Sequence, residues 1–315
     1  MKITRGLAAH RRVPHPVLTI GNFDGQHLGH RALLREVVTR AAAAGGTPMV
    51  LTFDPHPVKV LAPHVNLRFL TTPDEKLAYF TDAGIAEVLF LEFTTAFAAL
   101  TPDQFMQLVL RDGIGMKELF VGEHFAFGRG RAGRIADLIR FGREADFQVH
   151  PVQPLRIDGE IVSSTRVRHL IKSGDVRGAA RCLGRHYALE GGVVSGEQRG
   201  RTLGWPTANL PLPPDRVIPA DGVYATKTLW GTRAFESVSY IGTRPTFGAG
   251  ERLLEVSLLD ARENLYGQSI RVEFVERVRG DQAFQSADEL SARIERDVQA
   301  ARQALKAEPQ PVTGV

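Results

Sequence analysis

The chain has 315 residues, 43% hydrophobic and 23% charged, a composition typical of a globular protein with two sizeable cores. Its formal net charge of +4 and pI near 9.4 make it mildly basic. A nucleic-acid-binding protein would concentrate this charge on one face, whereas the arginines here are scattered along the sequence. The charge therefore favours basic pockets for small anions over a nucleic-acid partner.

The sequence also indicates a compartment. Cys182 is the only cysteine, so no intramolecular disulfide can form, and its apolar neighbours predict a buried, inert thiol. The first residues lead into no apolar signal segment, and no run of about 18 apolar residues exists for a membrane span. We expect a cytoplasmic protein without a membrane partner.

The first half alternates strand and helix signals. Residues 17–20 predict a buried strand, the apolar positions from 34 to 41 recur at helical spacing, and residues 49–53 predict the next strand. Two helix starts, at 72–75 and 101–104, each offer a threonine cap, a proline and then an acid or amide. With further strands predicted at 88–91 and 119–121, repeated βα units indicate a parallel sheet covered by helices.

The pattern changes after a helix predicted at 175–183. Short β-type segments separated by Gly and Pro turns indicate an antiparallel sheet or small barrel, and they lie at 188–194, 222–229, 235–241, 253–259 and 270–274. The chain then closes with a helix capped by a Ser286–Glu289 box, whose apolar stripe should pack on the barrel. We therefore expect an α/β domain at 1–184 and a β domain at 185–315.

The first chemical motif, Gly21 to His30, follows the first strand and opens a helix. Its two imidazoles, His27 and His30, are three residues apart, and Gly29 lets a ligand approach the backbone. Such donors at a helix N-terminus can hold triphosphate oxygens. Two alternatives remain open from the residues alone, namely a metal pair lacking its third ligand and plain surface histidines.

The second motif, Ser163-Ser164-Thr165, opens a helix with Arg168 one turn in. Free amides, hydroxyls and a guanidinium make an anion site, although an ordinary helix cap beside a solvated arginine is the common alternative. The two motifs together resemble the bifunctional bacterial riboflavin kinase/FAD synthetases. This resemblance extends from Lys2 to about Arg302.

The resemblance implies a Rossmann-like nucleotidyltransferase domain that adenylylates FMN. It implies His27 and His30 as catalytic donors and an ATP site of Gly21, Asn22, Phe23, Asp24, His27, Gly29, His30, Ser163, Ser164, Thr165 and Arg168. By the same resemblance the flavin site contains Asp54, Pro55, His56, His124 and Phe125.

The second half resembles the riboflavin kinase part of the family, through the loop at 196–209 with its Pro-Thr-Ala-Asn core and the segments 242–247, 254–256 and 264–267. The resemblance implies an ATP site of Gly200, Arg201, Gly204, Pro206, Thr207 and Asn209. Thr207 and Asn209 carry the oxygen ligands that Mg²⁺ prefers. Glu255 is then the general base that takes the proton of the riboflavin 5′-hydroxyl.

The resemblance implies two reactions on one chain, riboflavin plus ATP to FMN and FMN plus ATP to FAD, with Mg²⁺ as cofactor and riboflavin, FMN and ATP as its partners. A homo-oligomer is left open. The alternatives are a kinase whose first domain has lost or changed its activity, and a non-catalytic flavin-binding or nucleic-acid-binding protein.

Three positions depart from the family pattern: His124 replaces Asp or Asn, Ser257 replaces His, and Tyr240 replaces Asn. His124 motivates the first alternative, because it lies close to the expected adenylylation site. Residues 128–133 match a dinucleotide-binding Gly-x-Gly-x-x-Gly, but they follow no strand directly and lack the later acid, so we interpret them as a basic loop.

Overall fold

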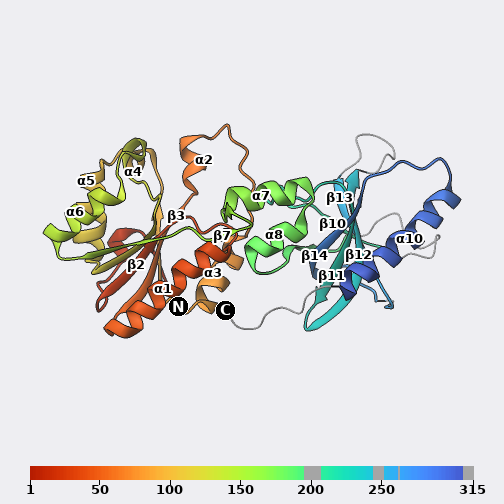
Figure 1. Cartoon of the computed structure of the whole chain (residues 1–315), viewed down its shortest axis with the longest axis horizontal. Coiled ribbons are helices and arrows are strands. Elements are labelled where there is room, and N and C mark those ends of the chain that lie inside the picture. Colours follow the sequence, from red (N-terminus) through yellow and green to blue (C-terminus); the bar gives the residue numbers. More distant parts are fainter. Residues whose placement is uncertain (195–206, 244–251, 262, 308–315) are drawn as a thin grey trace. The chain divides into compact units, whose positions relative to one another are not determined.

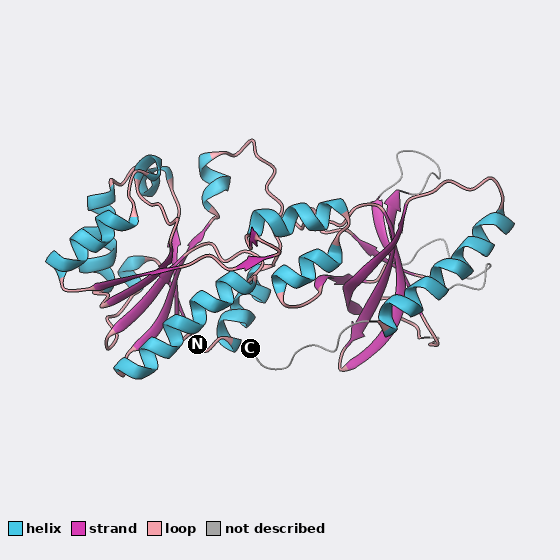
Figure 2. Ribbon diagram, in the orientation of Figure 1, coloured by secondary structure: helices cyan, strands magenta, loops and turns pink. Residues whose placement is uncertain are grey.

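The structure is a computed structural model that describes residues 1–194, 207–243, 252–261 and 263–307. The chain divides into two compact units, Met1–Ser163 and Ser164–Val315. Figures 1 and 2 show helices alternating with strands in the first unit and a mainly β second unit. The predicted α/β plus β fold class is confirmed.

The first unit contains a six-stranded sheet whose strand pairs are all parallel. In spatial order its strands are β1 (Lys2–Arg5), β4 (Glu87–Glu92), β3 (Thr47–Asp54), β2 (Pro16–Ile20), β5 (Glu118–Gly122) and β6 (Gln148–Val152). The sequence patterns missed the two edge strands, β1 and β6, because edge strands are only partly buried and carry too few apolar residues to be recognised.

Helices cover both faces of this sheet. They are η1 (Leu7–Ala9), α1 (Leu28–Ala44), α2 (Pro57–Leu61), α3 (Pro73–Asp82), α4 (Thr95–Ala98), α5 (Pro102–Gln104), the π-helical η2 (Phe105–Ile114), η3 (Arg129–Arg131) and α6 (Ile135–Ala145). One core packs α1 and α3 on the sheet, and the other packs η2 and α6 on the opposite face. A two-stranded ribbon, β7 (Arg156–Ile157) and β8 (Glu160–Ile161), follows β6.

The helix-start predictions are confirmed. Thr72 accepts a hydrogen bond from the Glu75 amide and the Glu75 carboxylate accepts one from the Thr72 amide, and Thr101 and Gln104 repeat this reciprocal pattern. Gly45 ends α1 in the left-handed conformation that favours glycine.

The strand order places a switch point between β2 and β5. The chain leaves β2 toward β3 and β4 on one side, whereas β5 and β6 lie on the other. In open parallel sheets, ligands bind beyond the carboxyl ends of the strands at such a point. The Gly21–His30 motif follows β2 directly, so the fold positions it where a ligand crevice is expected.

The second unit begins with two helices, α7 (Ser164–Ser173) and α8 (Val176–Leu183), and α8 packs on the barrel strands. Cys182 is buried on α8, as predicted. The predicted functional boundary near residue 184 remains a prediction.

Six antiparallel strands form a nearly closed barrel. Their spatial order is β10 (Ala208–Pro211), β13 (Arg252–Leu258), β12 (Arg233–Thr243), β11 (Gly222–Trp230), β14 (Ser269–Gly280) and β9 (Tyr187–Gly192). A single bridge between Val194 and Asn209 joins the two ends of the sheet. Strand β10 was missed from the sequence because only four residues form it.

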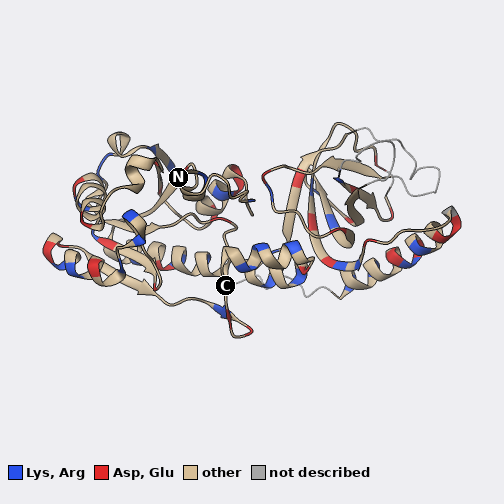
Figure 3. Ribbon diagram, turned by 90° about the horizontal axis from the view of Figure 1, so that it is seen from above, with Lys and Arg blue, Asp and Glu red and all other residues tan. Residues whose placement is uncertain are grey.

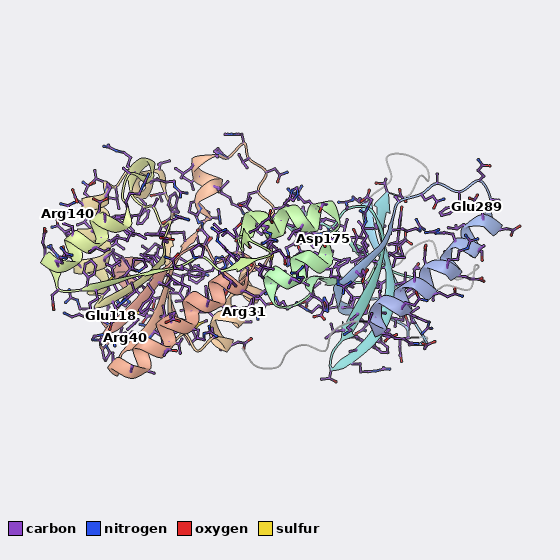
Figure 4. The ribbon with its side chains drawn as sticks, in the orientation of Figure 1. Arg31, Arg40, Glu118, Arg140, Asp175 and Glu289 are labelled. Atoms are coloured by element: carbon purple, nitrogen blue, oxygen red, sulfur yellow. The ribbon has the colours of Figure 1, made fainter. Side chains whose placement is uncertain are left out.

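The C-terminal helix α10 (Ala287–Lys306) packs on the outer face of the barrel through Val298, Ala301 and Leu305, as predicted. Ser286 caps it by accepting a hydrogen bond from the Glu289 amide. The capping box is only half formed, however, because the Glu289 carboxylate accepts from the Gln285 amide rather than that of Ser286. Figure 4 labels Glu289 at the start of this helix.

Candidate functional site

The two predicted imidazoles lie together at the N-terminus of α1. Their rings stack with centroids 3.6 Å apart and planes 16° apart. His27 caps the helix, because its Nδ1 accepts a hydrogen bond from the His30 amide at 3.2 Å. The cap orients the His27 ring, and the His30 ring stacks on it beyond the carboxyl end of β2, where a ligand crevice is expected.

Two predicted members of this site have structural roles. Phe23 is buried, lies 5.1 Å from the His30 ring and packs edge-on against Phe80. The buried Asp24 carboxylate accepts hydrogen bonds from the amides of Leu70 and Thr71. These contacts hold in place the loop that carries the two histidines.

Two other residues of the motif, Gly29 and Asn22, leave room at the backbone and contribute a buried oxygen without a hydrogen-bond partner among the described residues. A side chain at Gly29 would lie 3.2 Å from His27 Nδ1 and 3.7 Å from the Val162 carbonyl oxygen, so glycine keeps this approach open. Asn22 Oδ1 is buried and has no hydrogen-bond partner among the described residues. A bound ligand could supply that missing partner.

The approach of Val162 to Gly29 brings the start of the second motif to this end of the first unit. Ser163 is the last residue of that unit, whereas Ser164, Thr165 and Arg168 lie on α7 of the second unit. The joining of both motifs into one ATP site therefore remains a prediction.

The predicted flavin residues lie at the end of β3 and on the loops that follow β3 and β5. Asp54 precedes Pro55 at the end of β3 and forms an ion pair with Arg5 at 3.1 Å. His56 caps α2 and lies edge-on to Phe69. His124 is exposed, whereas Phe125 is half-buried and stacks on Phe127.

The sequence patterns missed a line of aromatic rings at the same end of the sheet. Phe53, Phe93 and Phe97 contact one another with centroids 5.4 to 5.7 Å apart, and all three are half-buried. The missed signal is the aromatic content of the segment that follows β4.

Lys76 is a second residue that sequence analysis missed. It lies one turn into α3, and burial lowers its pKa against the opposing attraction of the Asp24 and Asp54 carboxylates. A half-buried ammonium between two predicted site residues is a candidate phosphate ligand.

The predicted kinase residues lie on neighbouring barrel strands. Asn209 of β10 pairs directly with Glu255 of β13, and Glu255 pairs on its other side with Tyr240 of β12. Directly paired residues project from the same face of a sheet, so these three side chains form one row. Val238 belongs to the same face and packs under α10, so the row lies outside the barrel.

This row contains polar atoms that are buried without a partner. Asn209 is 3% exposed, and its Oδ1 has no hydrogen-bond partner in the described part of the chain. The hydroxyl oxygen of Ser257, two residues beyond Glu255, is also buried and has no hydrogen-bond partner in the described part of the chain. An amide oxygen left without a partner fits Mg²⁺, which prefers oxygen ligands. The other predicted residues, Gly200, Arg201, Gly204 and Pro206, lie outside the described residues.

A small open pocket adjoins this region. Thr207, which precedes β10, lines it, and its other walls are mainly apolar. Ala208 and Val256 belong to these walls and pair with each other, on the side of the sheet opposite Asn209 and Glu255.

Two further findings concern the described residues. They contain no group of three or more His, Cys, Asp or Glu side chains placed to hold a metal ion. None of their helices combines the length and the apolar character needed to cross a membrane.

The parallel sheet with a loop motif at its switch point and the antiparallel barrel with a polar row define a two-domain enzyme of nucleotide chemistry. Comparison with known families agrees. Residues 10–166 match the family model described as FAD synthetase, and residues 183–305 match that of riboflavin kinase.

Relatives match over nearly the whole chain. The bifunctional riboflavin kinase/FMN adenylyltransferase of Escherichia coli K12 is 40% identical over 306 residues, which cover 96% of this chain and 97% of that protein. The protein of the same name from Haemophilus influenzae is 35% identical and covers 96% and 98%. The chain belongs to the bifunctional riboflavin kinase/FMN adenylyltransferase family.

One solved structure shares the fold over nearly its full length. It is described as a macrolide-efflux protein from Streptococcus pneumoniae, is 29% identical, and superposes with a TM-score of 0.87 over 96% of this chain and 99% of that one.

Proposed function

We propose that this chain performs both reactions of its family, with the kinase site on the barrel and the adenylyltransferase site at the switch point of the parallel sheet. The register that places Glu255 between Asn209 and Tyr240 carries the kinase assignment. It supplies a carboxylate base beside an amide oxygen suited to a metal.

In the kinase reaction, Glu255 accepts the proton of the riboflavin 5′-hydroxyl as its oxygen attacks the γ-phosphorus of ATP. The bond from that phosphorus to the β,γ-bridging oxygen breaks, and FMN and ADP are formed. Thr207 and Asn209 would hold Mg²⁺, which supplies charge neutralisation on the phosphates. The small pocket beside Thr207, with its mainly apolar walls, adjoins these residues.

In the adenylyltransferase reaction, a phosphate oxygen of FMN attacks the α-phosphorus of a second ATP and pyrophosphate leaves. This nucleophile is already ionised near neutral pH, so no protein base is required. The stacked His27 and His30, together with Ser164, Thr165 and Arg168, would hold the triphosphate and offset the charge on the leaving pyrophosphate.

The partners in this proposal are small molecules. The ribbon in Figure 3 is coloured for acidic and basic residues in turn along α10, so this helix has no continuous basic stripe for a nucleic acid. The absence of a nucleic-acid partner, the cytoplasmic location and the oligomeric state remain predictions.

A flavin time course tests the proposal. The purified chain is incubated with riboflavin, ATP and Mg²⁺, and the flavins are separated by chromatography. We expect FMN first and FAD after it. FMN without FAD would support the alternative of an impaired first domain, with the exposed His124 as the residue to examine first. No conversion at all would contradict both assignments.

A further inference from the structure

We propose that Tyr240 is a positioning residue of the kinase site, where its ring forms a fixed wall against riboflavin. This inference rests on the proposed function, because it requires Glu255 to be the base of a riboflavin kinase. The family pattern does not predict it, because asparagine is usual at this position.

The register places Tyr240 beside the candidate base. Tyr240 and Glu255 are direct cross-strand partners on the outer face of the barrel. Their Cβ atoms are therefore expected to lie within about 5.5 Å of each other. A substrate whose hydroxyl reaches Glu255 must pass close to the tyrosine ring.

The ring is held at its far end. The Tyr240 hydroxyl donates a hydrogen bond of 2.9 Å to Asp281 Oδ1, which also accepts from the Gln282 amide. Burial, together with the carboxylates of Asp281 and Glu255, raises the pKa of Tyr240 above its usual value, so the hydroxyl keeps the proton it donates. The side chain is attached to β12 at one end and hydrogen-bonded to Asp281 at the other, so the direction of the ring is fixed.

Gly242 makes room for this arrangement. A Cβ atom at position 242 would collide with the Tyr240 hydroxyl, so the ring extends along β12 over the glycine. The apolar cluster beneath α10 includes Val238 of the same strand but does not include Tyr240. Among the described residues, Tyr240 therefore belongs to the outer row of the site rather than to the core.

The same row holds two buried polar atoms that point to a ligand. Asn209 Oδ1 and Ser257 Oγ have no hydrogen-bond partner in the described part of the chain, and their residues lie on either side of Glu255. Buried polar atoms without a partner are uncommon in folded proteins, and a bound ligand, ion or water is one way to supply the missing partner. Riboflavin carries a flat aromatic ring system that suits a rigid aromatic wall.

The test measures total FMN plus FAD formed at saturating ATP while riboflavin is varied. We expect Tyr240→Leu to raise the KM for riboflavin about tenfold and to leave kcat and the KM for ATP within about twofold. Asp281→Ala and Tyr240→Phe should each produce a smaller increase, because both release the ring. Asp281→Asn should restore near-normal values, because its amide oxygen still accepts the bond.

The conversion of added FMN to FAD serves as the internal control and should stay unchanged in all four variants. If wild-type chain forms no FMN, the proposed function fails. If wild-type chain is active and the riboflavin KM of folded Tyr240→Leu equals that of wild type, only this inference is overturned. Should Tyr240→Leu fail to fold, unchanged riboflavin KM values in both Tyr240→Phe and Asp281→Ala would overturn it.

Discussion

At the N-terminus of α1, His27 has a structural role beside His30, the proposed triphosphate ligand. His27 caps the helix and its ring stacks on that of His30. A ring committed to a cap has little freedom to move, and the ring stacked on it is aligned before any ligand arrives. Such preorganisation is what electrostatic stabilisation of a leaving group requires.

We therefore expect His30→Ala to lower FAD formation from FMN by about 100-fold or more, because a donor to the triphosphate is lost. FMN formation should continue at the wild-type rate. The measurement is a chromatographic assay of both flavins, with His64→Ala, an exposed histidine of the same unit, as the control. Loss of both activities in a folded variant would contradict the separation of the two sites.

Glu255→Gln should have the opposite effect. An amide cannot accept the proton of the hydroxyl, so FMN formation should fall by about 100-fold or more, while added FMN is still converted to FAD. Glu276→Gln, which removes a surface ion pair with Arg177, is the matched control. A Glu255→Gln chain that phosphorylates riboflavin normally would show that the base lies elsewhere.

At the scale of elements, the buried carboxylate of Glu118 connects strand β5 to α1, to β6 and to the segment before β2. Glu118 of β5 accepts hydrogen bonds from Arg40 of α1 at 2.7 Å, from His15 before β2 at 2.9 Å and from His150 of β6 at 2.9 Å. Figure 4 shows Arg40 and Glu118 close together at one end of the sheet. These contacts lie at the amino ends of the strands, opposite the candidate site, so their role is structural.

This cluster makes stability depend on pH. Burial opposes ionisation of Glu118, but the hydrogen bonds from Arg40, His15 and His150 outweigh it and lower its pKa to about 2 from an ordinary value of 4.5. The stabilisation is therefore complete above the unfolded-state pKa and is lost as the pH falls toward the folded-state pKa.

Glu118→Gln should consequently destabilise the chain by about 2 kcal/mol at neutral pH. The difference from wild type should shrink as the pH is lowered through the window between these two pKa values. Thermal unfolding at a series of pH values checks this, with Glu92→Gln, an exposed carboxyl at the end of β4, as the control. A difference that does not depend on pH would show that the carboxylate charge is unimportant.

At the scale of the whole molecule, the stacked histidines and the polar row of the barrel lie in separate compact units. The histidines belong to Met1–Ser163 and the polar row to Ser164–Val315, and each unit has its own core. FMN is a small, soluble product of one reaction and the substrate of the other, so it can pass between sites through solution.

A mixture of His30→Ala and Glu255→Gln chains should therefore make FAD from riboflavin, although neither variant does so alone. FMN should accumulate before FAD, and the rate should rise with the concentration of both chains. The flavins are followed by chromatography over time. If the mixture forms FMN but no FAD, the intermediate must be transferred within a single chain.

The sequence by itself determined the elements, because their signals are local. Thr72 and Thr101 each predicted a helix start, because a capping box joins two residues that are only three positions apart. The period of two in the barrel strands and the apolar stripe of α10 likewise depend on neighbours along the chain. The family resemblance further indicated both reactions, because its motifs are contiguous.

Only the tertiary structure decided which residues meet. The pairing of Glu255 with Asn209 and Tyr240 joins three strands, and the convergence of His15, Arg40 and His150 on Glu118 joins residues up to 103 positions apart. Strand β10 and the edge strands were missed because their few residues carry no periodic signal. The register between strands depends on both strands and on the connection between them, so the pattern of a single strand does not specify it.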